Sequence, residues 1–122
     1  MNAINWFEIP ASDFERATRF YGQIFATTLH VDSSFDGIRM AVFPHEGASV
    51  GGAVIEMSQA RPHSDGVRVY LNGGENLSAV LDRVEAAGGK VTLPKTFLRE
   101  EIGHIAMFAD TEGNLIGLHS LR

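Results

Sequence analysis

The chain of 122 residues contains no cysteine, so disulfides, zinc ribbons, iron–sulfur clusters and thiol catalysis are ruled out. No apolar run approaches the ~20 residues that a membrane-spanning helix needs. The N-terminal sequence MNAINWFEIP lacks the basic start and the long apolar stretch of a signal peptide, so we expect a cytoplasmic protein without a membrane partner. Bases are scarce: ten against fifteen acids give a net charge of −5, which disfavours nucleic acid as a partner.

Two catalytic classes also find no support. No glycine-rich loop leads from a strand into a helix, as phosphate binding requires, and no Ser–His–Asp pattern for acyl transfer is present. The hydrophobic share of 44% and the charged share of 20% are typical of a globular protein, and the length suits one domain over residues 1–122. We therefore expect a protein that acts on a small molecule.

Two segments have the apolar period of a helix. The first begins at Ser12, where Ser12 and Glu15 have the spacing of a capping box. It runs to about Phe25 with one apolar stripe: Phe14, Ala17, Tyr21 and Ile24. The second begins at Asn76 and ends at Gly88-Gly89, since paired glycines suit a left-handed cap. Its apolar stripe consists of Leu77, Val80, Leu81, Val84 and Ala87.

The remaining segments have the alternation and the turn signals of short strands. The predicted strands are Ala3–Ile9, Thr28–Asp32, Arg39–Phe43, Gly51–Met57, Val67–Leu71, Val91–Leu93 with a ragged continuation to Leu98, Ile105–Ala109 and Leu115–Ser120. The order is therefore βαβββ twice, with repeat one over about 1–58, a polar joint over 58–65 and repeat two over about 66–122. We predict an α+β fold in which the two repeats enclose a strand-lined cavity for a small ligand.

Four stretches resemble the vicinal oxygen chelate superfamily of glyoxalase I, bleomycin-resistance proteins and extradiol dioxygenases, in its branch related to lactoylglutathione lyase. They are Trp6–Asp13, Arg16–Phe25, Gly52–Met57 and Gly103–Ser120. The last is the most specific, because Asp-x-Glu-Gly-Asn between two strands resembles the family's final turn. The resemblance spans essentially the whole chain and implies the same fold, two βαβββ repeats, and a homodimer.

The resemblance also implies four metal-ligand positions, on the first and last strand of each repeat. They fall on Trp6, Glu56, Val67 (or Arg68, one residue later) and Gly117. Steps of 61 from position 6 to 67 and from 56 to 117 support this assignment. Only Glu56 has a metal-binding side chain, so the usual site is largely lost and no cofactor is expected.

Alternation predicts which other side chains face the cavity. Glu56 should face it as a tentative base or metal ligand, although a carboxylate solvated at the cavity mouth is the alternative. His119 should share a face with Gly117 and serve as a tentative acid/base, unless it is hydrogen-bonded in the wall or at a dimer contact. Glu8 shares a face with Trp6, and Glu8, Glu56 and His119 could form an alternative metal site, or Glu8 could pair with Arg39 or Arg68.

These residues leave more than one function open. The first hypothesis is a glyoxalase-like protein that binds a small molecule between its repeats, with Trp6, Glu8, Val67 and Gly117 as ligand-binding residues. Trp6 could stack on an aromatic ligand or fill the space of a lost metal. The alternative is a metal-dependent lyase or isomerase resembling glyoxalase I, with Glu56 as base or ligand. A purely structural or accessory domain is a third reading.

Overall fold

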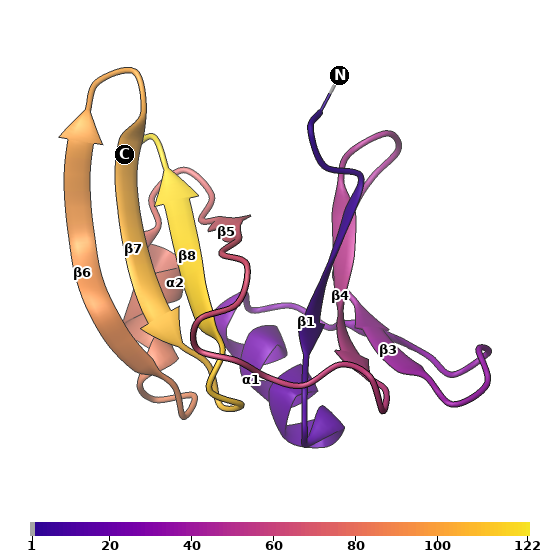
Figure 1. Ribbon diagram of the computed structural model, residues 1–122. Coiled ribbons are helices and arrows are strands. Elements are labelled where there is room, and N and C mark those ends of the chain that lie inside the picture. The colour runs from indigo at the N-terminus through magenta and orange to yellow at the C-terminus, as the bar shows by residue number, and fades with distance from the viewer. Residues whose placement is uncertain (1) are drawn as a thin grey trace.

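The structure, a computed structural model, describes residues 2–122 and confirms the predicted order of elements (Figure 1). Strand, helix and three strands follow one another twice, so the α+β fold with two βαβββ repeats is confirmed. The first repeat consists of β1 (Trp6–Pro10), α1 (Phe14–Ile24), β2 (His30–Asp32), β3 (Arg39–Val42) and β4 (Gly51–Glu56). The second consists of β5 (Tyr70–Asn72), α2 (Ser78–Val84), β6 (Lys90–Arg99), β7 (Gly103–Ala109) and β8 (Leu115–Ser120).

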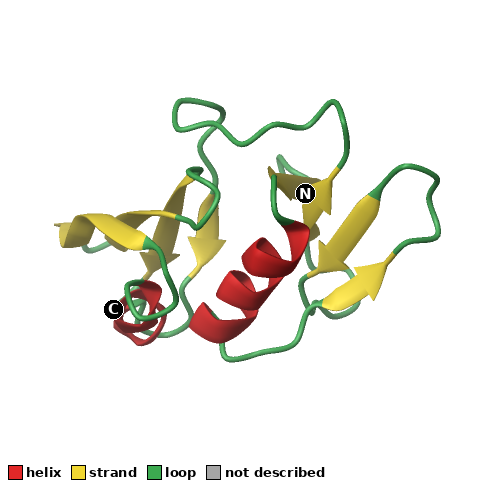
Figure 2. Ribbon diagram, turned by 90° about the horizontal axis from the view of Figure 1, so that it is seen from below, coloured by secondary structure: helices red, strands yellow, loops and turns green. Residues whose placement is uncertain are grey.

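Each repeat forms its own four-stranded mixed sheet. The strand order is β1-β4-β3-β2 in the first and β5-β8-β7-β6 in the second. The pairs β1–β4 and β5–β8 are parallel, whereas the other neighbours are antiparallel. The edge strands β1 and β5 are the strands of each sheet that lie nearest to the other repeat, and α1 lies between the two sheets (Figures 1 and 2).

Helix α1 belongs to the packing of both repeats. Its predicted stripe is fully confirmed, because all four side chains are buried: Phe14, Ala17, Tyr21 and Ile24. The helix also buries Phe20, whose ring centroid lies 5.8 Å from that of Phe108 on β7. The same ring occupies the space where a side chain at Gly89 would lie. One helix therefore supplies apolar surface to two sheets.

The predicted cap of α1 is wrong by one residue. Asp13 is the N-cap, and its carboxylate accepts the Arg16 amide at 3.1 Å. Ser12 instead bonds to the second repeat, where its amide and its hydroxyl each donate to Glu112 at 3.0 Å. The sequence could not show this partner, because the two residues lie 100 positions apart.

Two elements of the second repeat are shorter than predicted. Helix α2 begins at Ser78 rather than Asn76, whose side chain accepts the Ser78 amide at 2.9 Å. Strand β5 begins at Tyr70 rather than Val67, which is 95% exposed and lies outside both sheets. Within residues 2–122, neither helix has the length and the apolar character that crossing a membrane requires.

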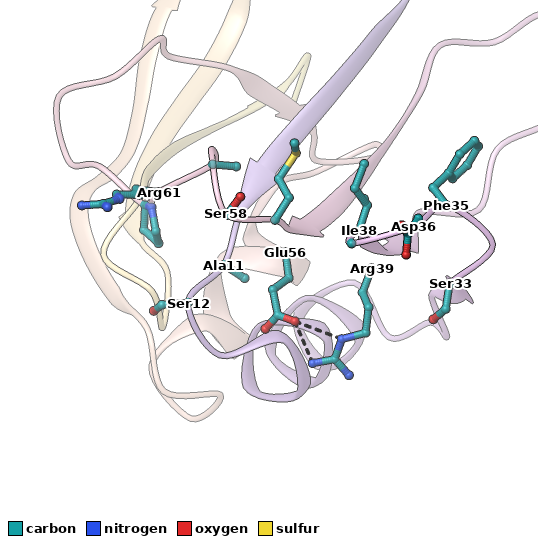
Figure 3. A pocket seen from close by; sticks show the side chains of 14 residues that line it. Ala11, Ser12, Ser33, Phe35, Asp36, Ile38, Arg39, Glu56, Ser58 and Arg61 are labelled. Carbon is teal, nitrogen blue, oxygen red and sulfur yellow. Dashed lines mark hydrogen bonds and ion pairs between the residues drawn. The ribbon is translucent and has the colours of Figure 1, made fainter.

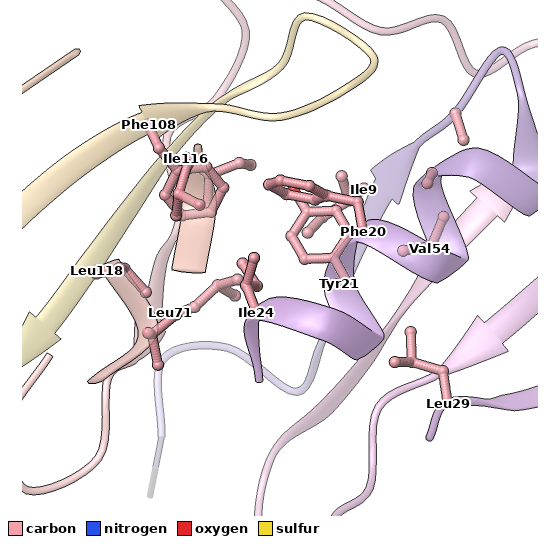
Figure 4. Close-up of a cluster of buried hydrophobic side chains, with 14 of the residues drawn as sticks. Ile9, Phe20, Tyr21, Ile24, Leu29, Val54, Leu71, Phe108, Ile116 and Leu118 are labelled. Atoms are coloured by element: carbon pink, nitrogen blue, oxygen red, sulfur yellow. The ribbon is translucent and has the colours of Figure 1, made fainter. Parts of the chain in front are cut away.

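One hydrophobic core joins the two repeats (Figure 4). It contains Ile9 and Val54 of the first sheet, Ile116 and Leu118 of the second, and the buried side chains of both helices. Side chains alternate along a strand, so each sheet has a core face, which contains these residues, and an opposite outer face. The outer faces are therefore turned away from the shared core.

The Asp-x-Glu-Gly-Asn turn connects β7 and β8 to the start of α1. The buried Asp110 accepts the Tyr21 hydroxyl at 2.7 Å and the amides of Glu112 and Asn114 at 2.9 Å. The side-chain amide of Asn114 donates to the carbonyl of Pro10 at 2.8 Å. The most specific motif of the sequence thus holds the two repeats together.

Candidate functional site

A cleft of about 900 Å³ lies between the two repeats, at the C-terminal end of α1. We call it the inter-repeat cleft. The first repeat contributes Phe7, Phe25 and Phe43, and the second contributes residues 68–72, which include the edge strand β5. The predicted cavity between the repeats therefore exists, but strand edges and a helix end line it, rather than two facing sheets.

Three phenyl rings form the apolar wall of this cleft. The ring of Phe43 lies 5.6 Å from that of Phe7 and 6.0 Å from that of Phe25, measured between centroids. Tyr21 supports Phe43 from the core, edge to face, at 5.6 Å. Rings that are packed against one another in this way keep a fixed surface, which suits an apolar or aromatic ligand.

The polar side of the cleft comes from β5 and the residues before it. Tyr70 is 47% exposed, and Asn72 and Arg68 are also exposed. Among the described residues that line the cleft, Arg68 alone is charged. Each sheet pairs these edge strands on one side only, so β1 and β5 also present backbone groups toward the cleft.

Glu56 lies elsewhere, in a second groove of about 640 Å³ beside the N-terminus of α1 (Figure 3). We call it the α1 groove. Strand β4 places Glu56 on its core face, in register with Arg39 of β3. The Arg39 Nε donates to Oε1 of Glu56 at 3.0 Å, and Nη2 lies 2.9 Å from the same oxygen. The third nitrogen, Nη1, donates to Glu15 at 2.6 Å. This hydrogen bond from Arg39 lowers the pKa of Glu15.

The prediction that Glu56 faces the same side as Trp6 and Glu8 is therefore wrong. Gly52, Val54 and Glu56 do share a face, but Val54 belongs to the core. In the parallel pair, Trp6 lies beside Gly51 and Glu8 beside Ala53, so the outer face takes the odd-numbered residues of β4.

The repeat step that supported this assignment is wrong as well. Equivalent backbone bonds end the parallel pairs: the Ala11 amide donates to the Ile55 carbonyl, and the Gly73 amide to the His119 carbonyl. The true steps are therefore 62 along the first strands and 64 along the last, rather than 61. An odd error moves every side chain to the opposite face. The repeat-two equivalent of Trp6 is Arg68, the alternative position named above, and Glu56 corresponds to Ser120.

Trp6, Glu8 and Val67 meet in a third groove, of about 350 Å³, along the seam between β1 and the segment before β5. The Trp6 indole is 39% exposed and donates to the Glu8 carboxylate at 3.3 Å. The expected pairing of Glu8 with Arg39 or Arg68 is absent from the ion pairs of residues 2–122. The groove has less than half the volume of the inter-repeat cleft, so these three residues form a smaller site.

Gly117 and His119 lie on the outer face of the second sheet, as their alternation predicts, because each is paired with an outer-face residue of β7. The space above Gly117 is not open, since the Tyr70 ring lies where a side chain at this position would be. The Nε2 of His119 lies 2.6 Å from the Ile102 carbonyl. His119 is therefore hydrogen-bonded, as the alternative interpretation holds, but on the outer face of the sheet rather than in the wall of the cleft. Neither residue lines the inter-repeat cleft.

The residues at the four ligand positions do not fit a metal. Trp6, Val67 and Gly117 have no suitable donor atom, and the Glu56 carboxylate is bonded to Arg39. Within the described part of the chain, no group of three or more His, Asp or Glu side chains could hold an ion. In the alternative set, Glu8 lies on the outer face of the first sheet, Glu56 on its core face, and His119 on the outer face of the second sheet. These three side chains therefore do not form one metal site.

Sequence reasoning missed the aromatic wall. Phe7 and Phe43 lie on predicted strands, but the sequence analysis assigned no role to either side chain. The sequence did contain a signal for this wall, because phenylalanine is frequent in the first 43 residues. The candidate Trp6 lies on the opposite face of β1 from Phe7.

The comparisons with known proteins agree with this architecture. Residues 3–118 match the model of the Glyoxalase/Bleomycin resistance protein/Dioxygenase superfamily. A glyoxylase-like domain-containing protein of Didymella fabae is 30% identical over 120 residues, which is 91% of this chain and 88% of that protein. Among solved structures, TnmS3, an antibiotic binding protein from Streptomyces sp. CB03234, is 27% identical with a TM-score of 0.72, over 98% of this chain and 96% of that one.

A more distant structure shows the same fold. A V278E mutant of glyoxalase I from Zea mays is 18% identical with a TM-score of 0.70, and the match covers 95% of this chain but 45% of the maize chain. The paired βαβββ repeats, the Asp-x-Glu-Gly-Asn turn and the family model over residues 3–118 lead to one conclusion. The chain belongs to the Glyoxalase/Bleomycin resistance protein/Dioxygenase superfamily.

Proposed function

We propose that the protein binds a small, largely apolar molecule in the inter-repeat cleft. The observation that carries the proposal is a cleft of about 900 Å³ whose apolar wall contains three phenyl rings, with Phe43 packed against both Phe7 and Phe25. Ligand sites for small molecules commonly have volumes of about 300–1,000 Å³, with a mostly apolar lining and a few polar groups. A contact between two aromatic rings contributes about 0.5–1.5 kcal/mol of interaction energy beyond that of the area it buries. Contacts of one aromatic ligand with several of these rings would therefore support binding in the micromolar range.

The likeness to TnmS3 supports a binding role, because that protein is described as antibiotic binding. The alternative, a lyase or isomerase with Glu56 as base, has no observation in its favour. Glu56 lies in the α1 groove and not in the inter-repeat cleft, and its carboxylate is hydrogen-bonded to Arg39. The proposed binding mode uses rings and hydrogen-bond donors, and we propose that it needs no metal cofactor.

The test uses a neutral fluorescent probe and a matched pair of variants. N-phenyl-1-naphthylamine fluoresces in apolar surroundings and has no charge. Thr27 is exposed and lines the cleft, whereas the next residue, Thr28, is exposed and does not line it. We expect saturable binding to the wild type, binding at least about tenfold weaker in Thr27→Trp, the size of effect that 1.4 kcal/mol gives, and unchanged binding in Thr28→Trp.

Two outcomes would contradict the proposal. Absence of saturable binding by this probe and by a broad set of apolar compounds would remove it. Equal affinity of both tryptophan variants would show that the probe binds outside the cleft. Thermal unfolding of each variant serves as the control for folding, and direct excitation of the probe avoids signal from the introduced tryptophan.

We also propose a homodimer and a cytoplasmic location. The outer faces and edges of the sheets carry exposed large apolar side chains, among them Trp6, Tyr70 and Phe97, and such surfaces are typical of protein contacts. Light scattering that gives a monomer mass across micromolar concentrations would refute the dimer. The location rests on composition alone, and fractionation of the native host tests it.

A further inference from the structure

We propose that the inter-repeat cleft selects anionic molecules, with Arg68 as the residue that binds the anionic group of an otherwise apolar or aromatic ligand. This inference rests on the proposed function, because it assigns a ligand class to the same cleft. It depends on the charges that line the cleft rather than on the phenyl rings that form its wall.

The charges at the cleft have one sign. The chain has fifteen acids and ten bases, yet no aspartate or glutamate is among the described residues that line the cleft, whereas Arg68 is. The α1 groove is different, since its lining contains two acids, Asp36 and Glu56, as well as Arg39 and Arg61. An overall charge of −5 repels anions from most of the surface. A cleft with one arginine and no acid is therefore a local exception that favours an anion.

Arg68 is available for a ligand. Within residues 2–122, the ion pairs use Arg16, Arg39, Arg99 and one histidine as cations, and Arg68 takes part in none of them. It is exposed and directly precedes the strand region that lines the cleft. An arginine without an acidic partner can offer its full fork of donors to a carboxylate or sulfonate.

The cleft also contains uncharged hydrogen-bond donors. The Tyr70 hydroxyl, the Asn72 side-chain amide and the Thr27 hydroxyl belong to residues that line it with Arg68. Strand β5 is an edge strand, so backbone amides on its free side are also available. A ligand that fits has a flat apolar body against Phe7, Phe25 and Phe43 and one acidic group directed toward Arg68.

The arrangement also separates the two binding contributions along the ligand. The rings come from the first repeat and Arg68 comes from the second. Loss of the guanidinium should therefore weaken the binding of anions while the apolar contribution remains. This separation allows the ligand class to be tested with two probes that share one aromatic skeleton.

The experiment compares 8-anilinonaphthalene-1-sulfonate with N-phenyl-1-naphthylamine, which is the same skeleton without the sulfonate. Each probe is titrated into the wild type, Arg68→Gln and Arg61→Gln. Arg61 is an exposed arginine that lines the α1 groove but not the inter-repeat cleft, so its variant controls for the loss of one positive charge. Competition between the two probes checks that they share a site.

We expect Arg68→Gln to weaken the sulfonate probe at least about tenfold, as loss of a hydrogen bond to a charged group predicts, and to change the neutral probe less than about twofold. Arg61→Gln should leave both affinities unchanged. Salt should weaken only the sulfonate probe, and only in proteins that retain Arg68.

Each contrary outcome separates this inference from the proposed function. If the neutral probe binds as tightly as the sulfonate and Arg68→Gln alters neither, the cleft binds apolar molecules and the selection for anions is wrong. If Arg61→Gln and Arg68→Gln weaken the sulfonate probe equally, the effect is general charge and the assignment of Arg68 is overturned. If neither probe binds the wild type, the proposed function fails first.

Discussion

The two ends of helix α1 use charge in opposite ways. At its N-terminus, three carboxylates are paired with arginines: Glu112 is bonded to Arg16, and Arg39 lies between Glu15 and Glu56. At its C-terminus, the inter-repeat cleft contains phenyl rings and Arg68, which forms no ion pair within residues 2–122. Charges that are neutralised within the chain hold the fold together, whereas a charge without an internal partner is left for a ligand.

Glu112 is the most extensively bonded carboxylate at the N-terminal end of α1. Its side chain is fully buried, and burial alone would raise the pKa of this carboxyl. The Arg16 guanidinium, the Asp13 amide and the hydroxyls of Thr111 and Ser12 outweigh burial and lower the pKa to about 2. The network joins residues about 100 positions apart, so it connects the second repeat to the start of the first helix.

The largest expected effect is on the free energy of unfolding of Glu112→Gln. The amide keeps the shape but loses the charge and turns a donor toward Arg16 or the backbone amides of α1, so we expect a loss of about 2–4 kcal/mol. Urea unfolding measures it. Glu101→Gln is the matched control, because the Glu101 carboxylate is exposed and 3.7 Å from Arg99, and surface pairs contribute about 0–1 kcal/mol.

The same variant gives a test in pH. A folded pKa of about 2 against an ordinary value of 4.5 means that the unfolded chain binds the proton first as pH falls. The stabilisation is therefore complete above pH 4.5 and is lost between about 4.5 and 2. We expect the difference in unfolding free energy between wild type and Glu112→Gln to shrink in this range. Parallel curves down to pH 2 would show that Glu112 does not titrate with a lowered pKa.

A smaller loss of unfolding free energy is expected for Tyr21→Phe, and Tyr21 lies on α1 between the two regions compared. The Tyr21 hydroxyl donates to the buried Asp110 at 2.7 Å, while its ring packs on Phe43 of the cleft wall. Burial, and then the charge of Asp110, raise the pKa of Tyr21, so the hydroxyl stays protonated. We expect a loss of about 1–2 kcal/mol in unfolding free energy with unchanged affinity for the neutral probe. A weaker probe affinity would mean that the turn network also shapes the cleft.

The sequence predicted the fold well because periodicity reports local geometry. The stripe of α1 was correct in every residue, since a helix has one apolar face and the period identifies it. The number and order of the strands were also correct, although bounds such as the start of β5 were not. The start of α1 was wrong because Ser12 is bonded to Glu112, and no local pattern shows a partner so far along the chain.

The site was harder to predict for a specific reason. Alternation shows that Gly52, Val54 and Glu56 share a face, but it does not say which face is covered. On β4 both faces are apolar, and Ala53 and Ile55 are as buried as Val54. The assignment of Glu56 to the cavity face therefore rested on the resemblance, and the repeat step that supported it was 61 in place of 62 and 64. The cleft itself combines strand edges and a helix end, which only the packing of the two repeats brings together.

The smallest expected effect is that of Arg39→Gln, and it tests the comparison most directly, because Arg39 and Arg68 differ in their partners rather than in their chemistry. Arg39 is 41% exposed at its side chain, is paired with two carboxylates and lies 4.5 Å above the Phe14 ring. Exposed pairs and a cation–π contact of this kind contribute roughly 0.5–1 kcal/mol, so urea unfolding should show a loss of that size, reduced by salt.

Arg39→Gln should leave the affinities of both naphthalene probes within about twofold of the wild type, an energy below 0.5 kcal/mol, whereas Arg68→Gln should discriminate between them. If removing Arg39 weakens the sulfonate probe as much as removing Arg68 does, internal pairing does not decide which arginine binds an anion. If the two variants instead separate cleanly, one in stability and the other in binding, the partner of a charge, and not its type, assigns its role in this fold.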